Sequence, residues 1–248
     1  MSVNESNRRP AFYAAAPGGW RDWWTLLHPP YTAWHLGYVV IGACLAPVVL
    51  LTNLLATLLA FFAAVGLAAH ALDELNGRPL RTAIPSSVLW GVAVGGLAVA
   101  IGLGAAGIDR VGWQLLPFLV VGPILVVAYN FELWGGIVHN DVGFGVAWGA
   151  FPVLTAYVAQ TGTLAWAPVI AAVAAMALSV AQRSLSTPAR LVRRRTVGVE
   201  GQLRLMDGRV TSLDARSLLA PLETALRWMS GAVVLFAAAL AVARLAPS

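Results

Sequence analysis

Three ionisable side chains close an apolar run in the first third of the chain. No acidic residue occurs from Val39 to Ala69, and His70, Asp73 and Glu74 then follow within about one turn. Residues three and four apart lie on one face of a helix, so these side chains are predicted to be neighbours. Carboxylates at the end of a membrane helix are costly unless they face water, a partner or a metal ion. The alternative is a solvated helix end followed by an ordinary loop.

The composition places the chain in a membrane. Of 248 residues, 59% are hydrophobic and only 11% are charged, with a mean hydropathy of +0.75. A soluble domain carries roughly 25% charged residues. All sixteen basic residues are arginines. We expect their distribution along the chain to reflect membrane topology rather than nucleic-acid binding. The single cysteine, Cys44, excludes an intrachain disulfide.

The apolar pattern predicts an all-α polytopic protein with about seven transmembrane helices. A spanning helix needs roughly 20 apolar residues. Residues 1–19 are predicted to be a disordered tail, and residues 20–245 a single helical domain that begins with an interfacial helix rich in tryptophan. The predicted spans are 32–52, 53–73, 86–107, 113–129, 142–161, 164–182 and 224–245.

The arginines predict the orientation. A cytoplasmic N-terminus places fourteen of the sixteen arginines inside and leaves only Arg110 and Arg244 outside. This asymmetry follows the positive-inside rule. We therefore expect a multi-pass integral membrane protein, in a prokaryotic plasma membrane, whose site opens to the cytoplasm.

The segment 183–223 is predicted to be a basic cytoplasmic loop. Its arginines are expected to lie against anionic lipid headgroups, and the alternative is that they close over the site. Apolar and polar residues then alternate around Asp207–Gly208, which predicts a small β-hairpin insertion. The part from 196 to 223 is a candidate surface for a protein partner.

Three passages resemble the UbiA superfamily of intramembrane prenyltransferases. HPPYTAWHLGYVVIGACLA (28–46) is similar to the family's first helix, and HALDELNGRPLRTAIP (70–85) is similar to its first Asp-rich motif and the loop that follows. YNFELWGGIVHNDVGFGVAWGAFPVLTAYVAQTG (129–162) is similar to its tyrosine-containing loop. The resemblance covers about residues 25–195 and implies a UbiA-like helical bundle.

The resemblance also implies a chemistry. In that family, Asp-rich motifs hold Mg²⁺ ions that grip a prenyl diphosphate, and the prenyl group is transferred to an acceptor or cyclised. On this basis Asp73, Asp141 and Tyr129 are the catalytic candidates, and His70, Asp73 and Glu74 are the metal candidates. The substrate-binding candidates are Arg78, Arg81, Gln182, Arg183 and Asn53.

One departure from the family leaves the function open. The second Asp-rich motif is expected near 179–190, where Gln182 and Arg183 stand and no acidic residue occurs. The first reading is a transferase with a reduced metal site, in which fixed arginines replace the second ion. The second is an inactive scaffold that binds an isoprenoid lipid or serves another membrane enzyme. The third is a transition-metal site built from His70, Asp73, Glu74, Glu132, His139 and Asp141.

Overall fold

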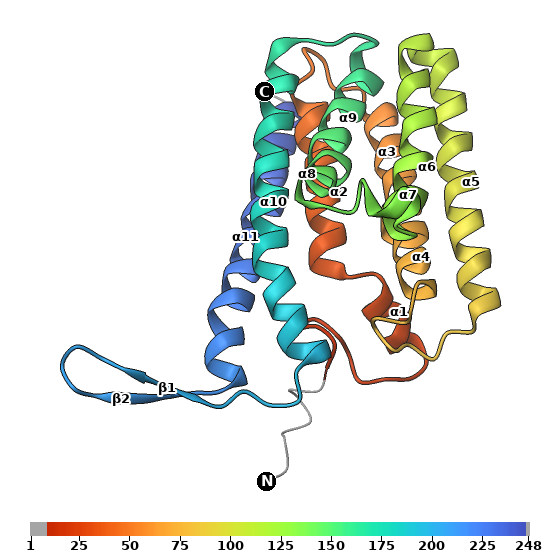
Figure 1. Ribbon diagram of the computed structural model, residues 1–248. Coiled ribbons are helices and arrows are strands. Elements are labelled where there is room, and N and C mark those ends of the chain that lie inside the picture. The colour runs from red at the N-terminus through yellow and green to blue at the C-terminus, as the bar shows by residue number, and fades with distance from the viewer. Residues whose placement is uncertain (1–8, 247–248) are drawn as a thin grey trace.

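The computed structural model describes residues 9–246 as a helical bundle with one projecting hairpin (Figure 1). The helices are α1 (Trp20–Leu26), α2 (Pro29–Cys44), α3 (Leu51–Phe61), α4 (His70–Leu75), α5 (Ser86–Val111), α6 (Leu116–Asn130), α7 (Leu133–Gly136), α8 (Asp141–Gly145), α9 (Phe151–Thr161), α10 (Trp166–Arg195) and α11 (Ala215–Leu245). A short 3₁₀ turn, η3 (Trp113–Leu115), precedes α6.

Two long helical rods contain π-helical turns. The turn η2 (Phe62–Ala69) joins α3 to α4, and η4 (Val146–Ala150) joins α8 to α9. With these joins, six helical rods within residues 9–246 are long and apolar enough to cross a membrane: Leu51–Leu75, Ser86–Val111, Trp113–Asn130, Asp141–Thr161, Trp166–Arg195 and Ala215–Leu245. The prediction of a polytopic helical membrane protein therefore agrees with the structure.

The structure has six candidate spans within residues 9–246, and not the predicted seven, because α2 is short. It ends at Cys44, whereas the apolar pattern continues to residue 52. Sixteen residues rise about 24 Å, which is less than the roughly 30 Å hydrocarbon core. Side chains on α2 such as Trp34 and Tyr38 are almost fully buried, because the helix packs against α9 and α11 inside the bundle.

The loop after α2 needs hydrogen-bond partners because irregular backbone is costly at membrane depth. Arg244 donates to the carbonyls of Ala46 and Pro47. The side chain of Gln160, itself buried, accepts from the Leu50 amide at 2.8 Å and donates to the Leu50 carbonyl at 3.4 Å. Two side chains from later helices thus replace the hydrogen bonds that a longer α2 would have made.

The hairpin prediction is confirmed. Strands β1 (Gly201–Arg204) and β2 (Val210–Leu213) pair antiparallel, with Gly201 opposite Leu213. Gly208, at φ 82°, supplies the left-handed backbone that the turn requires. The hairpin projects sideways from the ends of α10 and α11 (Figure 1). Both helices are longer than expected, since α10 runs through Pro188 and α11 starts directly after its N-cap, Asp214.

Residues 9–19, expected to belong to a disordered tail, pack against the bundle. Arg194 donates to the Pro10 carbonyl, and the Ala15 amide donates to Thr25 Oγ1 at 3.0 Å. Phe12 lies beneath the guanidinium of Arg227, 5.0 Å from its ring centre. The rest of the predicted tail, residues 1–8, lies outside the described residues.

We expect Gln160→Leu to lower the free energy of unfolding by about 1–3 kcal/mol, because it leaves the backbone groups of Leu50 without partners. Equilibrium unfolding in mixed micelles measures the change. Gln114→Leu is the matched control, since Gln114 is exposed at the same end of the bundle. Equal stability of the two variants would show that Gln160 does not support the loop.

Candidate functional site

A polar cavity of about 130 Å³ lies where α2, α4 and α6 meet the lower half of α10. All four histidines of the chain line it, although they come from four different segments. The polar and charged lining is Tyr13, His28, Tyr31, His35, His70, Asp73, Tyr129, Asn130, His139, Gln182, Arg183, Ser186, Arg190, Arg194 and Glu223. Most of the ionisable groups of the bundle interior are therefore concentrated in one place.

Each histidine is held in the same way. The Nδ1 atom of His28 donates to the Leu26 carbonyl at 2.7 Å, and that of His35 donates to the Trp148 carbonyl at 2.9 Å. His70 Nδ1 donates to Gly66 at 3.1 Å, and His139 Nδ1 donates to Tyr129 at 3.0 Å. With Nδ1 protonated, the neutral ring keeps a lone pair on Nε2. The cavity is thus lined by four imidazole rings, each oriented by a hydrogen bond from Nδ1 to a backbone carbonyl.

The π-helical turns explain two of these contacts. Wider i to i+5 bonding shifts the regular backbone pairing, and such turns are frequent at functional sites. The Gly66 carbonyl lies in η2 and the Trp148 carbonyl lies in η4. These two carbonyls hold His70 and His35, respectively.

Tyr129, Asp141 and Arg183 form one connected network. Arg183 Nε donates to Asp141 at 2.8 Å, and its Nη1 donates to the Tyr129 hydroxyl. The Tyr129 ring also stacks on His139, with 4.5 Å between ring centres. Asp141 follows the N-cap Asn140, so the start of α8 places its carboxylate beside α10. The network fixes the guanidinium of Arg183 at the wall of the cavity.

Two further arginines bring positive charge to the cavity. Arg190 and Arg194 lie one turn apart on α10, and both line the cavity. Arg193, between them, instead pairs with Glu223 on α11, with 2.8 Å between Nη2 and Oε2. Asp73 is the acidic residue opposite, and within residues 9–246 its carboxylate makes no hydrogen bond or ion pair.

One oxygen atom of a buried amide in the cavity also lacks a partner within the described residues. Gln182 is only 6% exposed, and its Oε1 atom has no hydrogen bond within the described part of the chain. An unpaired buried polar atom costs about 1–3 kcal/mol. A ligand that bonds to this amide would recover that energy.

Glu74 has a different task from its neighbour Asp73. It is fully buried and accepts hydrogen bonds from the amides of Leu80 and Thr82 and from the Thr82 hydroxyl, at 2.8–2.9 Å. Its two oxygens therefore hold the loop 76–85 and do not face the cavity. Within residues 9–246, no group of three or more His, Cys, Asp or Glu side chains is arranged to hold a metal ion.

The remaining predicted residues lie elsewhere. Arg78 donates to the Ile84 carbonyl and to Ser86 Oγ within the loop, and Arg81 is exposed beside it. Asn53 lies at the other end of the bundle, where it donates to the Ala159 carbonyl. The segment 183–223 was predicted to be a loop, whereas Arg190 and Arg194 lie on α10. His28, Arg190 and Arg194 line one cavity because of tertiary packing, which no local pattern reports.

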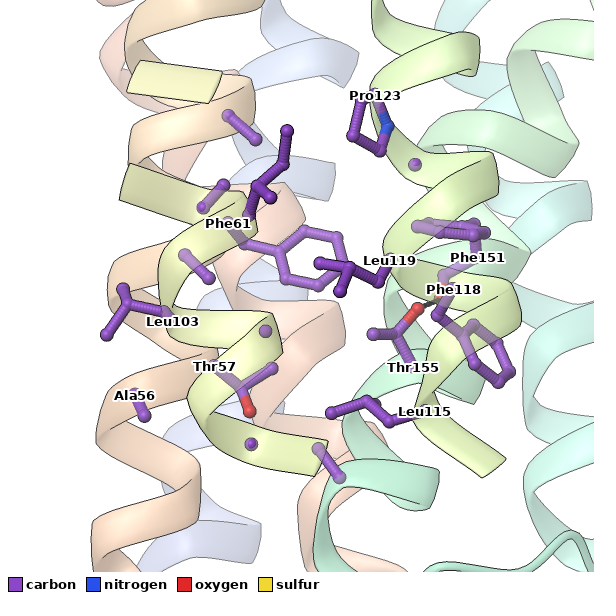
Figure 2. A pocket seen from close by; sticks show the side chains of 18 of the residues that line it. Ala56, Thr57, Phe61, Leu103, Leu115, Phe118, Leu119, Pro123, Phe151 and Thr155 are labelled. Carbon is purple, nitrogen blue, oxygen red and sulfur yellow. Dashed lines mark hydrogen bonds between the residues drawn. The ribbon is translucent and has the colours of Figure 1, made fainter. Parts of the chain in front are cut away.

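A second hollow adjoins the polar cavity. It is an apolar groove of about 320 Å³ between α3, α5, α6 and α9 (Figure 2). Phe61, Leu119 and Phe151 point into it. Val65 and Trp148 line both hollows, so the polar cavity and the groove are neighbours that share these two side chains.

Comparison with family models, with curated proteins and with solved structures found no match to this chain. The resemblance to the UbiA superfamily therefore stays a prediction, and the chemistry of the cavity has to be inferred from its own residues.

We expect Glu74→Ala to lower the free energy of unfolding by about 2–4 kcal/mol, because two buried backbone amides lose their acceptor. Asp73→Ala, one residue away, is the matched control and should leave the stability unchanged or higher. Chemical unfolding followed by tryptophan fluorescence measures both. A similar loss in both variants would contradict the division of roles.

Stability should also fall as the pH drops below about 6.5. Burial, followed by the neighbouring His70, lowers the pKa of His28 well below its usual value. The unfolded chain then binds a proton that the folded chain does not, so acid favours unfolding by about 1 kcal/mol per pH unit. Thermal unfolding at pH 7.5 and 5.5 should show a smaller acid loss in His28→Gln than in the wild type. Equal losses in the two proteins would exclude His28 as a source of the effect.

Proposed function

We propose that this chain binds a prenyl diphosphate in the polar cavity and transfers or cyclises its prenyl group. The observation that carries the proposal is the join at Val65 and Trp148, where an arginine-lined polar cavity meets an apolar groove. An amphiphile with a multiply charged head and a hydrocarbon chain fits both environments. A purely polar ligand would leave the groove unused, and a neutral lipid would leave Arg190 and Arg194 without an acidic partner in the described residues.

The arginines account for the diphosphate. A guanidinium presents a planar fork that binds phosphate oxygens through charge-assisted hydrogen bonds. Arg190 and Arg194 supply two such groups, and Arg183 supplies a third whose position is fixed by Asp141. Fixed positive charge at this point stabilises the negative charge that develops on a leaving diphosphate.

The proposed reaction then follows from ordinary allylic chemistry. The bond between the first prenyl carbon and the diphosphate oxygen breaks, and its electron pair leaves with the diphosphate. The allylic cation is stabilised by the aromatic faces of Tyr129, Phe144 and Trp148, all of which line the cavity. An acceptor or an internal double bond supplies the new electron pair. The released proton goes to the Nε2 atom of an imidazole, for which His70, three residues before Asp73, is the candidate.

The described residues do not fit a resident Mg²⁺ site. Glu74 accepts hydrogen bonds from the loop, and Asp141 accepts a hydrogen bond from Arg183. Asp73 remains as a single free carboxylate. No step of the proposed reaction is routed through Mg²⁺, and its participation stays a prediction of the family resemblance.

The lack of a three-ligand metal group within residues 9–246 favours a second candidate, an inactive scaffold that binds the same class of lipid. The two candidates share the binding site and differ in turnover. Release of inorganic diphosphate from a prenyl diphosphate by the purified protein supports transfer or cyclisation. Binding without release, in the presence of Mg²⁺ and of candidate phenolic acceptors, supports the scaffold.

Arg190→Gln should weaken the binding of farnesyl thiodiphosphate, a slowly reacting analogue, by about tenfold or more, because one charge-assisted contact is lost. Arg195→Gln is the matched control, since Arg195 is exposed in the same arginine-rich end of α10 and does not line the cavity. Calorimetric titration in nanodiscs, with Mg²⁺ and with a chelator, measures the affinity. Unchanged affinity in Arg190→Gln would exclude the polar cavity as the diphosphate site.

A further inference from the structure

The apolar groove has a second polar end, far from the polar cavity. Its lining residues on α5 run from Leu97 to Val111, and those on α3 and η2 run from Asn53 to Val65. The one charged residue in its lining is Arg110, in the last turn of α5. The groove thus begins at Arg110 and ends at Val65 and Trp148, where the polar cavity starts.

The charge of Arg110 is not compensated within the described part of the chain. Arg110 is exposed, and no hydrogen bond, ion pair or ring contact involves it within residues 9–246. Arg244, at the same end of the bundle, differs because its guanidinium is bound to the carbonyls of Ala46 and Pro47. The adjacent Asp109 is exposed and does not line the groove. A guanidinium with free donors therefore stands at the mouth of a hydrocarbon-lined hollow.

Two exposed tryptophans indicate where this end of the groove lies relative to the bilayer. Trp113, three residues after Arg110, is 72% exposed, and Trp166, at the start of α10, is 82% exposed. Indole rings prefer the headgroup region of a bilayer. Arg110 is thereby placed at the level of lipid phosphates, with the groove extending from it toward the membrane centre.

The groove itself must be filled by hydrocarbon in a membrane. Ile101, on its rim, is 41% exposed, so the groove opens toward the surrounding lipid on the side of α5 and α6. Its polar side chains other than Arg110 are few, and Thr57 and Thr155 bond to carbonyls of their own helices. Water would find almost no partners there, whereas an acyl chain would match the lining.

We propose that the apolar groove is a binding site for one anionic phospholipid of the leaflet opposite the polar cavity. Its phosphate is bound by Arg110 and one acyl chain lies in the groove toward Val65 and Trp148. From Arg110 to Leu97, α5 rises about 20 Å, which accommodates most of an extended acyl chain at about 1.2 Å per bond. The proposal does not depend on a prenyl diphosphate in the polar cavity. The prenyl chain of the proposed substrate would enter the same groove from Val65 and Trp148, so the acyl chain and the prenyl chain are expected to exclude one another there.

Native mass spectrometry of delipidated protein with equal amounts of phosphatidylglycerol and phosphatidylcholine tests the proposal. The wild type should retain phosphatidylglycerol about tenfold better, and Arg110→Gln should lose this preference. Ala100→Phe, which fills the groove, should retain neither lipid. Ala98→Phe, on the exposed side of the same helix, is the matched control and should behave as the wild type.

Three results would overturn the proposal. They are equal retention of the two lipids by the wild type, a preference that survives in Arg110→Gln, and loss of the preference in Arg190→Gln, which would place the headgroup in the polar cavity. A phosphatidylglycerol with a photoreactive group at the end of its acyl chain gives an independent measurement. Its cross-links should map to the lining of the groove near Val65, Trp148 and Phe151, and cross-links confined to residues outside this lining would also contradict the site. In delipidated protein, where no phospholipid competes for the groove, prenyl diphosphate binding by Arg110→Gln should be unchanged, which separates this result from the test of the proposed function.

Discussion

Satisfaction of polar groups at membrane depth is the constraint on which this structure depends. Helix α2 is too short to cross the hydrocarbon alone, and the loop that follows it has backbone groups that lipid cannot solvate. Arg244 and Gln160 bind those groups from two later helices. The short helix is therefore stable only inside the bundle, where α9 and α11 enclose it and its N-terminal end brings His28 and His35 to the polar cavity.

The same constraint distinguishes carboxylates that stabilise the fold from the one that is available to a ligand. Glu74 and Glu223 are both buried, and each is occupied, one by loop amides and the other by Arg193. Asp141 is occupied by Arg183. Asp73 alone among the acidic residues of the cavity is left without a partner in residues 9–246. A cavity that holds arginines, imidazole rings and one carboxylate without a partner in the described residues is suited to an anionic ligand, and less suited to a metal ion held by the protein alone.

Much of the fold could be predicted from the sequence, because apolar length, arginine asymmetry and the Asp207–Gly208 turn are local signals. The length of α2 could not, since the residues after Cys44 remain apolar and their partners lie more than a hundred positions away. At the site, His70 and Asp73 were found from their spacing. Glu74 shares that spacing, yet its side chain turns to the following loop, which only the folded chain reveals. Likewise, Tyr13 and Arg194 line the same cavity although most of the chain separates them, and no pattern within one segment predicts this.

The positions of His70 and Asp73 in the cavity depend on the number of residues in the π-helical turn η2 that precedes them. A helix advances about 100° per residue, so a rod with one residue too many presents a different face beyond that point. The π-helical turn accommodates its residues with wider i to i+5 bonding, and His70 and Asp73 follow it directly. The direction in which these two side chains point therefore depends on the number of residues in Phe62–Ala69 and on the bonding of this turn. In evolutionary terms, an insertion or deletion at this turn can create or abolish the site without any substitution in it.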